Sequence, residues 1–307
     1  MKIIITGATG LIGKKLCQTL IKRGDEVIVF SRNSAFARIK IPNANKYIEW
    51  DYSNPSAWQN ELSNADAVIH LAGANLFGRR WNSSYKKNIL ESRIVSTKNL
   101  AEAIKNSSNP PAILITSSAV GYYGDKLDEI IYETSLPGND FLAALCKRLE
   151  EEASAVEKYN VRRVSIRTGV VLSNEGGALK QMLIPFEFFV GGSIGNGKQW
   201  FPWIHINDIV RIYLFALDNN IIKGAINAAS PNPVTMKNFA KILGKNLHRP
   251  SVFSIPKFAL RIFLGEVAGA AAASQRIYPK KLIDMDFKFE FKDLDEALRD
   301  LLKQKKD

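Results

Sequence analysis

The stretch that decides the fold is Thr6-Gly7-Ala8-Thr9-Gly10-Leu11-Ile12-Gly13, which follows the apolar run at residues 2–6. Glycines stand at positions 7, 10 and 13, and a helical pattern of apolar residues continues over residues 11–22. A strand, a glycine turn and a helix in this order are typical of dinucleotide binding, because the turn needs bare backbone where a pyrophosphate approaches. The N–H groups and dipole at the start of the helix favour such an anion. The residues expected to bind the dinucleotide here are Gly7, Thr9, Gly10, Leu11, Ile12 and Gly13.

The rest of the chain alternates between strand-like and helix-like patterns. Apolar, β-branched runs recur at residues 26–30, 47–50, 67–70, 112–116 and 163–167, and helical patterns lie near 85–104 and 140–157. This alternation predicts the α/β class, with a Rossmann-type, doubly wound parallel sheet covered by helices on both faces. In such a sheet, ligands bind beyond the carboxyl ends of the strands, where the strand order reverses.

The pattern changes after Arg167, where glycine pairs and several prolines interrupt the chain. We expect an NADP-binding Rossmann domain over residues 1–170 and a smaller C-terminal substrate lobe over residues 171–307. The two parts are expected to exchange segments. With 307 residues and 46% hydrophobic side chains, the chain is long and apolar enough to bury a substantial core.

Composition excludes several classes of protein. The formal charge is +12, but no basic segment interleaves with aromatic residues, so we expect a solvated basic surface and no nucleic-acid partner. Two cysteines, Cys17 and Cys146, allow neither a disulfide scaffold nor a cysteine-based zinc site, and we expect no metal. Without a signal peptide or a run of roughly 20 apolar residues, we expect no membrane partner and a cytoplasmic location. A homodimer remains open.

The end of the second predicted strand addresses the choice of dinucleotide. An NAD site usually places Asp or Glu there to bind the ribose 2′-hydroxyl. This chain has Ser31 and Arg32 instead, and an arginine can pair with the 2′-phosphate of NADP in bidentate fashion. The alternative is a solvated surface arginine. The sequence favours NADP(H) over NAD(H).

Other residues that end the predicted strands are candidates for the cofactor site. Trp50 and Asp51 are placed to meet the adenine, or else they are a core tryptophan and a capping aspartate. His70, by contrast, is more typical of a core histidine than of a catalytic acid. The small residues after His70, Leu71, Ala72 and Gly73, leave room for the ribose chain. The backbone groups of Gly169 and Val170, after the sixth strand, can meet the nicotinamide amide.

These motifs resemble the extended short-chain dehydrogenase/reductase superfamily, together with the segments SSA at 117–119, YG at 123–124 and IHIND at 204–208. More narrowly, the chain resembles the atypical group called epimerase family proteins, of the NAD-dependent epimerase/dehydratase type. That resemblance is carried by SSAVGYYG at 117–124, NDFLAALC at 139–146, RTGVVLS at 167–173, GKQWFPWIHIND at 197–208 and a DUF1731-like block, SQRIYPKKLIDMDF, at 274–287. It spans essentially the whole chain, and some relatives carry a cell-division-inhibitor label.

The superfamily resemblance implies hydride transfer coupled to proton transfer. A tyrosine supplies the proton, a lysine four residues later lowers the pKa of that tyrosine, and a serine orients the carbonyl. Here Leu142 stands at the tyrosine position and Cys146 at the lysine position. Ser118 is still present to orient the carbonyl, and either Tyr122 or Tyr123 is expected to supply the proton. Aromatic packing under the cofactor is the alternative for both tyrosines.

Three further features have both a functional and a structural interpretation. Cys146 is a reactive thiol if its pKa is depressed, or else an inert buried cysteine. Arg93 stands where the superfamily has an asparagine, and it selects an anionic substrate or forms a structural ion pair. The third feature is the glycine-rich loop near residue 195. We expect Lys198, Gln199 and Trp200 of this loop to contact the substrate, and the alternative is that they are exposed to solvent.

The sequence therefore favours an NADP(H)-binding reductase or epimerase. Its unknown substrate is expected to be a small carbonyl or sugar-like molecule, with anionic compounds included. The alternative is a nucleotide-binding regulatory or scaffold protein without turnover, for example in cell division, because the usual Tyr/Lys pair is missing.

Overall fold

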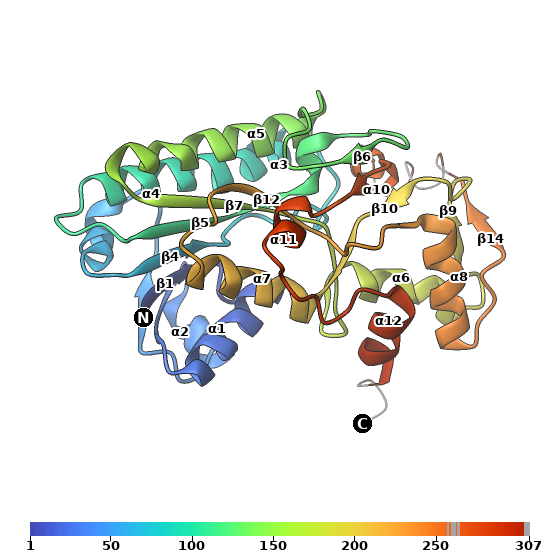
Figure 1. Ribbon diagram of the computed structural model, residues 1–307, viewed down its shortest axis with the longest axis horizontal. Helices are drawn as coiled ribbons and strands as arrows, with labels where there is room; N and C mark the ends of the chain where they lie inside the picture. Colours follow the sequence, from blue (N-terminus) through green and yellow to red (C-terminus); the bar gives the residue numbers. More distant parts are fainter. Residues whose placement is uncertain (257, 259–261, 263–264, 304–307) are drawn as a thin grey trace.

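The computed structural model describes residues 1–256, 258, 262 and 265–303, and a seven-stranded parallel sheet forms its centre (Figure 1). In spatial order the strands are β12 (Gly224–Ala228), β7 (Arg162–Thr168), β5 (Ile113–Ala119), β4 (Ala67–His70), β1 (Lys2–Thr6), β2 (Glu26–Ser31) and β3 (Lys46–Glu49). The chain winds outward from β1 to β3 and then returns to β4 on the other side of β1. This reversal opens a crevice beyond the carboxyl ends of β1 and β4.

The first strand shows why this sheet is parallel and covered on both faces. Ile3, Ile4 and Ile5 are each 0% exposed, and Ile4 belongs to a different core cluster from its two neighbours. Since successive side chains of a strand point to opposite faces, an uninterrupted apolar run is what a doubly covered strand requires. The predicted fold class is confirmed.

Helices cover the two faces as separate layers (Figure 1). One layer contains α3 (Ser83–Leu90), α4 (Ser96–Lys105) and α5 (Phe141–Ser154), and the other contains α1 (Leu11–Arg23), α2 (Ser34–Lys40) and α7 (Ile206–Asp218). Among the residues described, every helix is too short or too polar to span a bilayer. A π-helical turn, Glu91–Val95, separates α3 from α4, so the single helix predicted over 85–104 is interrupted. Such turns often occur at functional sites.

The chain beyond residue 170 contributes both to the sheet and to a lobe beside it. It supplies the edge strand β12 and the helix α7. The remaining elements are β8 (Val170–Leu172), α6 (Gly177–Glu187), β9 (Gly192–Ile194), β10 (Trp200–Phe201), β11 (Trp203–His205), β13 (Val234–Thr235), α8 (Met236–Leu247), β14 (Phe253–Ile255), α10 (Val267–Ala272), β15 (Arg276–Ile277), α11 (Lys280–Asp284) and α12 (Leu294–Lys303). β15 pairs with β6 (Ile130–Ile131), which lies between β5 and α5 in the chain.

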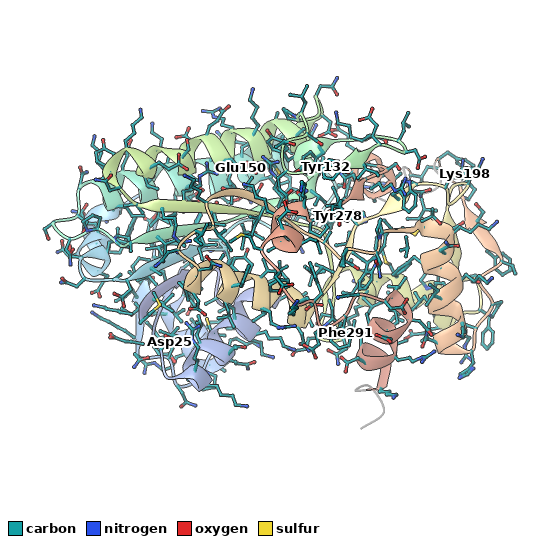
Figure 2. All side chains as sticks on the ribbon, viewed as in Figure 1. Asp25, Tyr132, Glu150, Lys198, Tyr278 and Phe291 are labelled. Atoms are coloured by element: carbon teal, nitrogen blue, oxygen red, sulfur yellow. The ribbon has the colours of Figure 1, made fainter. Side chains whose placement is uncertain are left out.

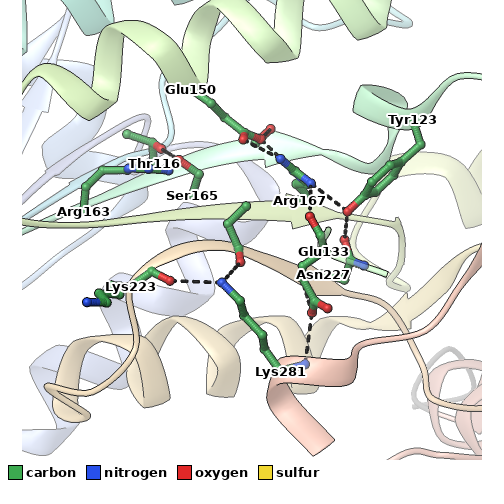
Figure 3. A network of polar contacts seen from close by, with 12 residues as sticks. Thr116, Tyr123, Glu133, Glu150, Arg163, Ser165, Arg167, Lys223, Asn227 and Lys281 are labelled. Carbon is green, nitrogen blue, oxygen red and sulfur yellow. Dashed lines mark hydrogen bonds and ion pairs between the residues drawn. The ribbon is translucent and has the colours of Figure 1, made fainter. Parts of the chain in front are cut away.

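A buried ion pair between β7 and α5 is the centre of a polar network (Figure 3). Arg167 donates from Nε to Glu150 Oε1 (2.9 Å) and from Nη2 to Oε2 (2.8 Å), and its side chain is 5% exposed. Arg167 Nη1 also donates to the hydroxyl of Tyr123 (2.8 Å), which in turn donates to Asn227 Oδ1 on β12 (2.7 Å). The network therefore connects α5 with three segments that end on the same side of the sheet.

The same network holds the C-terminal block against the edge of the sheet. The Glu133 carboxylate accepts the N–H groups of Asn227 and Lys281, and Lys281 Nζ donates to the carbonyls of Lys223 (3.2 Å) and Ala225 (2.8 Å). These contacts give Lys281 a structural role in joining α11 to β12, as Figure 3 shows.

We expect Arg167→Met to lower the free energy of unfolding by about 3–5 kcal/mol, because it leaves the Glu150 carboxylate buried without its cation. Urea denaturation followed by circular dichroism measures this loss. Lys147→Met on the same helix is the matched control. Lys147 and Glu151 form an exposed ion pair at 3.9 Å, so the loss of this pair should lower the free energy of unfolding by less than about 1 kcal/mol. Equal costs for the two variants would contradict this assignment.

Candidate cofactor and active site

The glycine turn brings two stretches of backbone into close contact. Gly7 has φ +68°, and a Cβ atom there would lie 2.6 Å from the carbonyl carbon of Leu71. A Cβ at Gly13 would lie 2.4 Å from the carbonyl oxygen of Gly7. Both positions therefore exclude any larger side chain, as the sequence pattern requires. The turn packs directly on the segment that follows β4.

The N-terminus of α1 fits the pyrophosphate of a dinucleotide. Its N-cap residue is Gly10, no side chain forms a cap, and no acidic residue stands in the first turn. Thr9 and Gly10 are exposed, so the start of the helix is open at the surface. Uncapped N–H groups and the helix dipole at this point attract an anion. Leu11, Ile12 and Gly13 supply the N–H groups of this first turn.

The end of β2 presents the arginine that the sequence singled out. Ser31 donates its hydroxyl to the Asn33 carbonyl, and Asn33 caps α2. Arg32 is exposed, and no ion pair or hydrogen bond of its side chain occurs within the described part of the chain. Asp51, after β3, is also exposed, and hydrogen bonds from the hydroxyl and N–H of Ser53 lower the pKa of its carboxyl.

Trp50 and His70 are core residues. Trp50 is 3% exposed, and its ring packs against Phe30 and edge-on against His70, with centroids 5.7 Å apart. Its ring is therefore not open to an adenine in this structure. The His70 ring nitrogens lie 2.7 Å from the Thr6 hydroxyl and 3.1 Å from that of Ser96. Burial, and then the charge of Arg93, lower the pKa of His70 to about 4, so the ring is neutral at neutral pH.

Arg93 enters the crevice from the π-helical turn. A Cβ on Gly73 would lie 2.8 Å from Arg93 Cζ, so the glycine after β4 makes room for the guanidinium. Arg93 Nη1 is buried, and it has no hydrogen-bond partner within the described residues. Burial lowers the pKa of Arg93, an effect that the neighbouring Cys146 and Tyr85 oppose. A buried cationic donor without an acceptor is uncommon in folded proteins and calls for a ligand or water.

The helix α5 carries leucine and cysteine toward the same point. Leu142 is 9% and Cys146 is 5% exposed, one turn apart. Cys146 lies beside Ser118, the N–H of Ala119 and Arg93, and burial raises the pKa of its thiol to about 11. At neutral pH the thiol is therefore protonated, which favours the inert alternative over a thiolate nucleophile.

The serine and the two tyrosines of the 117–124 motif have different environments. Ser118 is 5% exposed and donates its hydroxyl to Glu150 Oε1 (2.7 Å), so this hydrogen faces the ion pair instead of the crevice. Tyr123 is 0% exposed, and burial raises its pKa to about 12, so it is part of the core network. Tyr122 is half-buried, with the Arg167 guanidinium 3.5 Å from its ring centroid.

The remaining predicted contacts are already used within the protein, with the exception of Lys198. The N–H groups of Gly169 and Val170 donate to the carbonyls of Ala228 and Pro202. Lys198 is exposed and lies at the outer end of the C-terminal lobe (Figure 2). Gln199 is 8% exposed and donates to the Ile194 carbonyl, and Trp200 Nε1 donates to Asp128 (2.5 Å).

A cavity of about 440 Å³ was missed by the sequence reasoning. It lies between the start of α5 and α10, and Leu142 forms part of its wall. Trp81 and Phe141 also line it, with ring centroids 5.1 Å apart. The adjacent run Arg79-Arg80-Trp81, two charges and an aromatic ring in a loop after β4, was the available signal.

A family model described as "NAD dependent epimerase/dehydratase family" matches residues 3–229, across the glycine turn and the whole central sheet. The chain belongs to this family. A second model, "Domain of unknown function (DUF1731)", matches residues 255–301. Epimerase family protein YfhF of Bacillus subtilis is 38% identical over 307 residues, with 100% of this chain and 99% of that protein covered.

Solved structures agree with this membership. Human epimerase family protein SDR39U1 (isoform 2), whose crystal structure contains NADPH, has a TM-score of 0.88 and 32% identity, covering 99% of each chain. UDP-glucuronic acid 4-epimerase from Bacillus cereus, in complex with UDP-glucuronic acid and NAD, has a TM-score of 0.79. It is 21% identical, covers 99% of each chain and shows the shared fold alone.

We expect Gly13→Ala to abolish measurable NADPH binding, because the added methyl group displaces the backbone of the turn at Gly7. Titration calorimetry with NADPH measures binding, and circular dichroism checks that the variant is folded. Gly24→Ala is the control, since Gly24 ends the same helix with φ +89° and open space around it. It should lose about 1–2 kcal/mol of stability and keep its NADPH affinity. Undiminished binding by a folded Gly13→Ala variant would contradict the assigned cofactor site.

Proposed function

We propose that the protein is an NADP(H)-dependent oxidoreductase, a reductase or epimerase that acts on a small carbonyl compound. The observation that carries this proposal is Arg93, a half-buried arginine whose buried Nη1 has no partner among the described residues. It lies against Gly73 in the crevice beside the glycine turn, where dinucleotides and their substrates meet in this fold. Reduced nicotinamide supplies a hydride to a carbonyl carbon.

Each residue of the site then has a defined task. Arg93 holds the substrate oxygen on which negative charge develops. Ser118 orients the substrate once its hydroxyl turns away from Glu150, whose carboxylate remains held by two nitrogens of Arg167. Tyr122 supplies the proton, because the Tyr123 hydroxyl is used inside the core.

The preference for NADP(H) rests on Arg32. Its exposed guanidinium follows β2, where no carboxylate stands to bind a ribose 2′-hydroxyl. The human relative is described with NADPH, in line with this preference, while the more distant epimerase is described with NAD.

We expect Arg32→Ala to weaken NADPH binding by about 1–3 kcal/mol, because one charge-assisted contact to the 2′-phosphate is lost. The affinity for NADH should not change, so NADH serves as the internal control in the same calorimetric titration. Equal losses for the two nucleotides would show that Arg32 does not recognise the 2′-phosphate.

A screen of aldehydes, ketones and keto acids for NADPH oxidation at 340 nm tests turnover directly. For any compound that reacts, Arg93→Met should lower kcat/KM by about 10- to 100-fold and leave the NADPH affinity unchanged. Arg148→Met, an exposed arginine on α5 that lies 4.0 Å from Glu152, should not alter turnover. Full activity of the Arg93→Met variant would contradict the assigned role.

A second candidate function is a nucleotide-binding regulator or scaffold without turnover. The buried Leu142 and Cys146 favour it, because they occupy the positions of the superfamily's tyrosine and lysine. Tight NADPH binding without oxidation of any compound, together with a protein partner that dissociates on NADPH release, would support it. Turnover that depends on Arg93 would exclude it.

A further inference from the structure

The cavity beside Leu142 is lined in large part by apolar groups. It contains the rings of Trp81 and Phe141 and, on and just after α10, three residues whose side chains are at most a methyl group: Gly269, Ala270 and Ala273. Aromatic rings beside such small residues favour a ring-shaped apolar body, and about 440 Å³ is enough for a small molecule.

The cavity lies next to the proposed reaction site, because both share the start of α5. Leu142 lines it and lies one helical turn before Cys146, which is next to Ser118 and Arg93. A compound whose reactive oxygen contacts Arg93 can therefore extend its other end past Leu142 into the cavity.

Among the described residues of the cavity wall, the charged side chains are carboxylates: Asp125, Asp140 and Glu266. Asp125 Oδ1 accepts the N–H of Leu127 and of Ser274, and Asp140 Oδ1 accepts the N–H of Ala143. Within the described residues, no partner is seen for the Oδ2 atom of either aspartate. Both aspartates are exposed, so these oxygens are available to a ligand.

Two cations near this wall are already engaged. Lys86 forms an ion pair with Glu266, and its ammonium lies 5.3 Å from the centroid of the Phe141 ring. Arg80 lies beside Gly265 and takes part in another interaction. Among the described lining residues, the two aspartates are therefore the charged groups that form no ion pair. They favour a donor or a cation and disfavour a diphosphate.

We propose that this cavity binds the distal end of the substrate, and that the substrate is a small compound with a ring-like apolar body and an amine or similar hydrogen-bond donor. A nucleoside diphosphate sugar does not fit this description. The inference rests on the proposed function, since it places the reactive end of the compound at Arg93.

Three para-substituted acetophenones test the inference, with aminomethyl, methyl and carboxylate substituents. Calorimetric titration into protein saturated with NADP⁺ measures binding without turnover. The aminomethyl compound should bind at least 10-fold more tightly than the carboxylate, the methyl compound should lie between them, and UDP-glucose should give no heat.

Three variants test whether the preference for the amine arises in the cavity. Asp125→Asn combined with Asp140→Asn should remove the preference for the amine, and asparagine caps a helix as well as aspartate does, so α5 is preserved. Glu151→Gln, an exposed carboxylate on α5 outside the cavity, should retain the preference. Gly269→Trp should abolish binding of all three compounds, since the space around Gly269 is open and the indole fills the cavity.

The results that would overturn the inference can be told apart from those that would overturn the proposed function. Equal or tighter binding of the carboxylate compound, binding of UDP-glucose, or no binding of any acetophenone overturns the inference. If NADPH oxidation that depends on Arg93 is found at the same time, the proposed function stands and the inference about the cavity fails. Protein that binds neither NADP⁺ nor NADPH overturns both.

Discussion

The structure depends on a contact between two stretches of backbone, the glycine turn after β1 and the Leu71–Ala72 peptide after β4. With φ +68° and a Cβ position only 2.6 Å from that peptide, Gly7 lets the two strands end at the same level. The first turn of α1 then points its N–H groups into the crevice, and Gly73, the residue directly after this contact, leaves space for Arg93. One close approach therefore sets both the expected cofactor position and the position of the buried guanidinium.

The resemblance to the extended short-chain dehydrogenase/reductase superfamily implies a tyrosine and a lysine on α5, and this chain has Leu142 and Cys146 at those positions. Arg93 supplies a fixed positive charge from the π-helical turn between α3 and α4, in the same layer of helices as α5. The Glu150–Arg167 pair stays behind Ser118 and keeps the end of β5 in place. Positive charge is thus still supplied to the site, but by another helix and in a different geometry.

The sequence predicted those strands and helices whose local pattern of apolar residues is enough to determine the secondary structure. The bounds of β1 and β4 are as predicted, because a strand buried on both faces must be an apolar run. β12 was missed, since Gly-Ala-Ile-Asn-Ala has little strand propensity and is held by its pairing with β7. The π-helical turn was also missed, because an apolar pattern does not reveal a shift in backbone hydrogen bonding.

For the site, the glycine turn could be found from spacing and residue type, and Arg93 from its position in the superfamily resemblance. Whether Trp50 faces a ligand or the core depends on packing with Trp58 and His70, which are close only in the folded chain. The cavity needs α5 and α10, more than 100 residues apart, to come together, so the run Arg79-Arg80-Trp81 marks one loop of its wall but does not predict the cavity. Lys281 likewise acquires its role only through Glu133 and the edge strand.

Backbone amide shifts of ¹⁵N-labelled protein, recorded while NADPH is added, test the central claim most directly. We expect the largest changes on residues 9–13, at the start of α1, with a second group at Ser31 and Arg32. Saturable binding that leaves these amides unchanged, or the absence of any shift at millimolar NADPH, would contradict it.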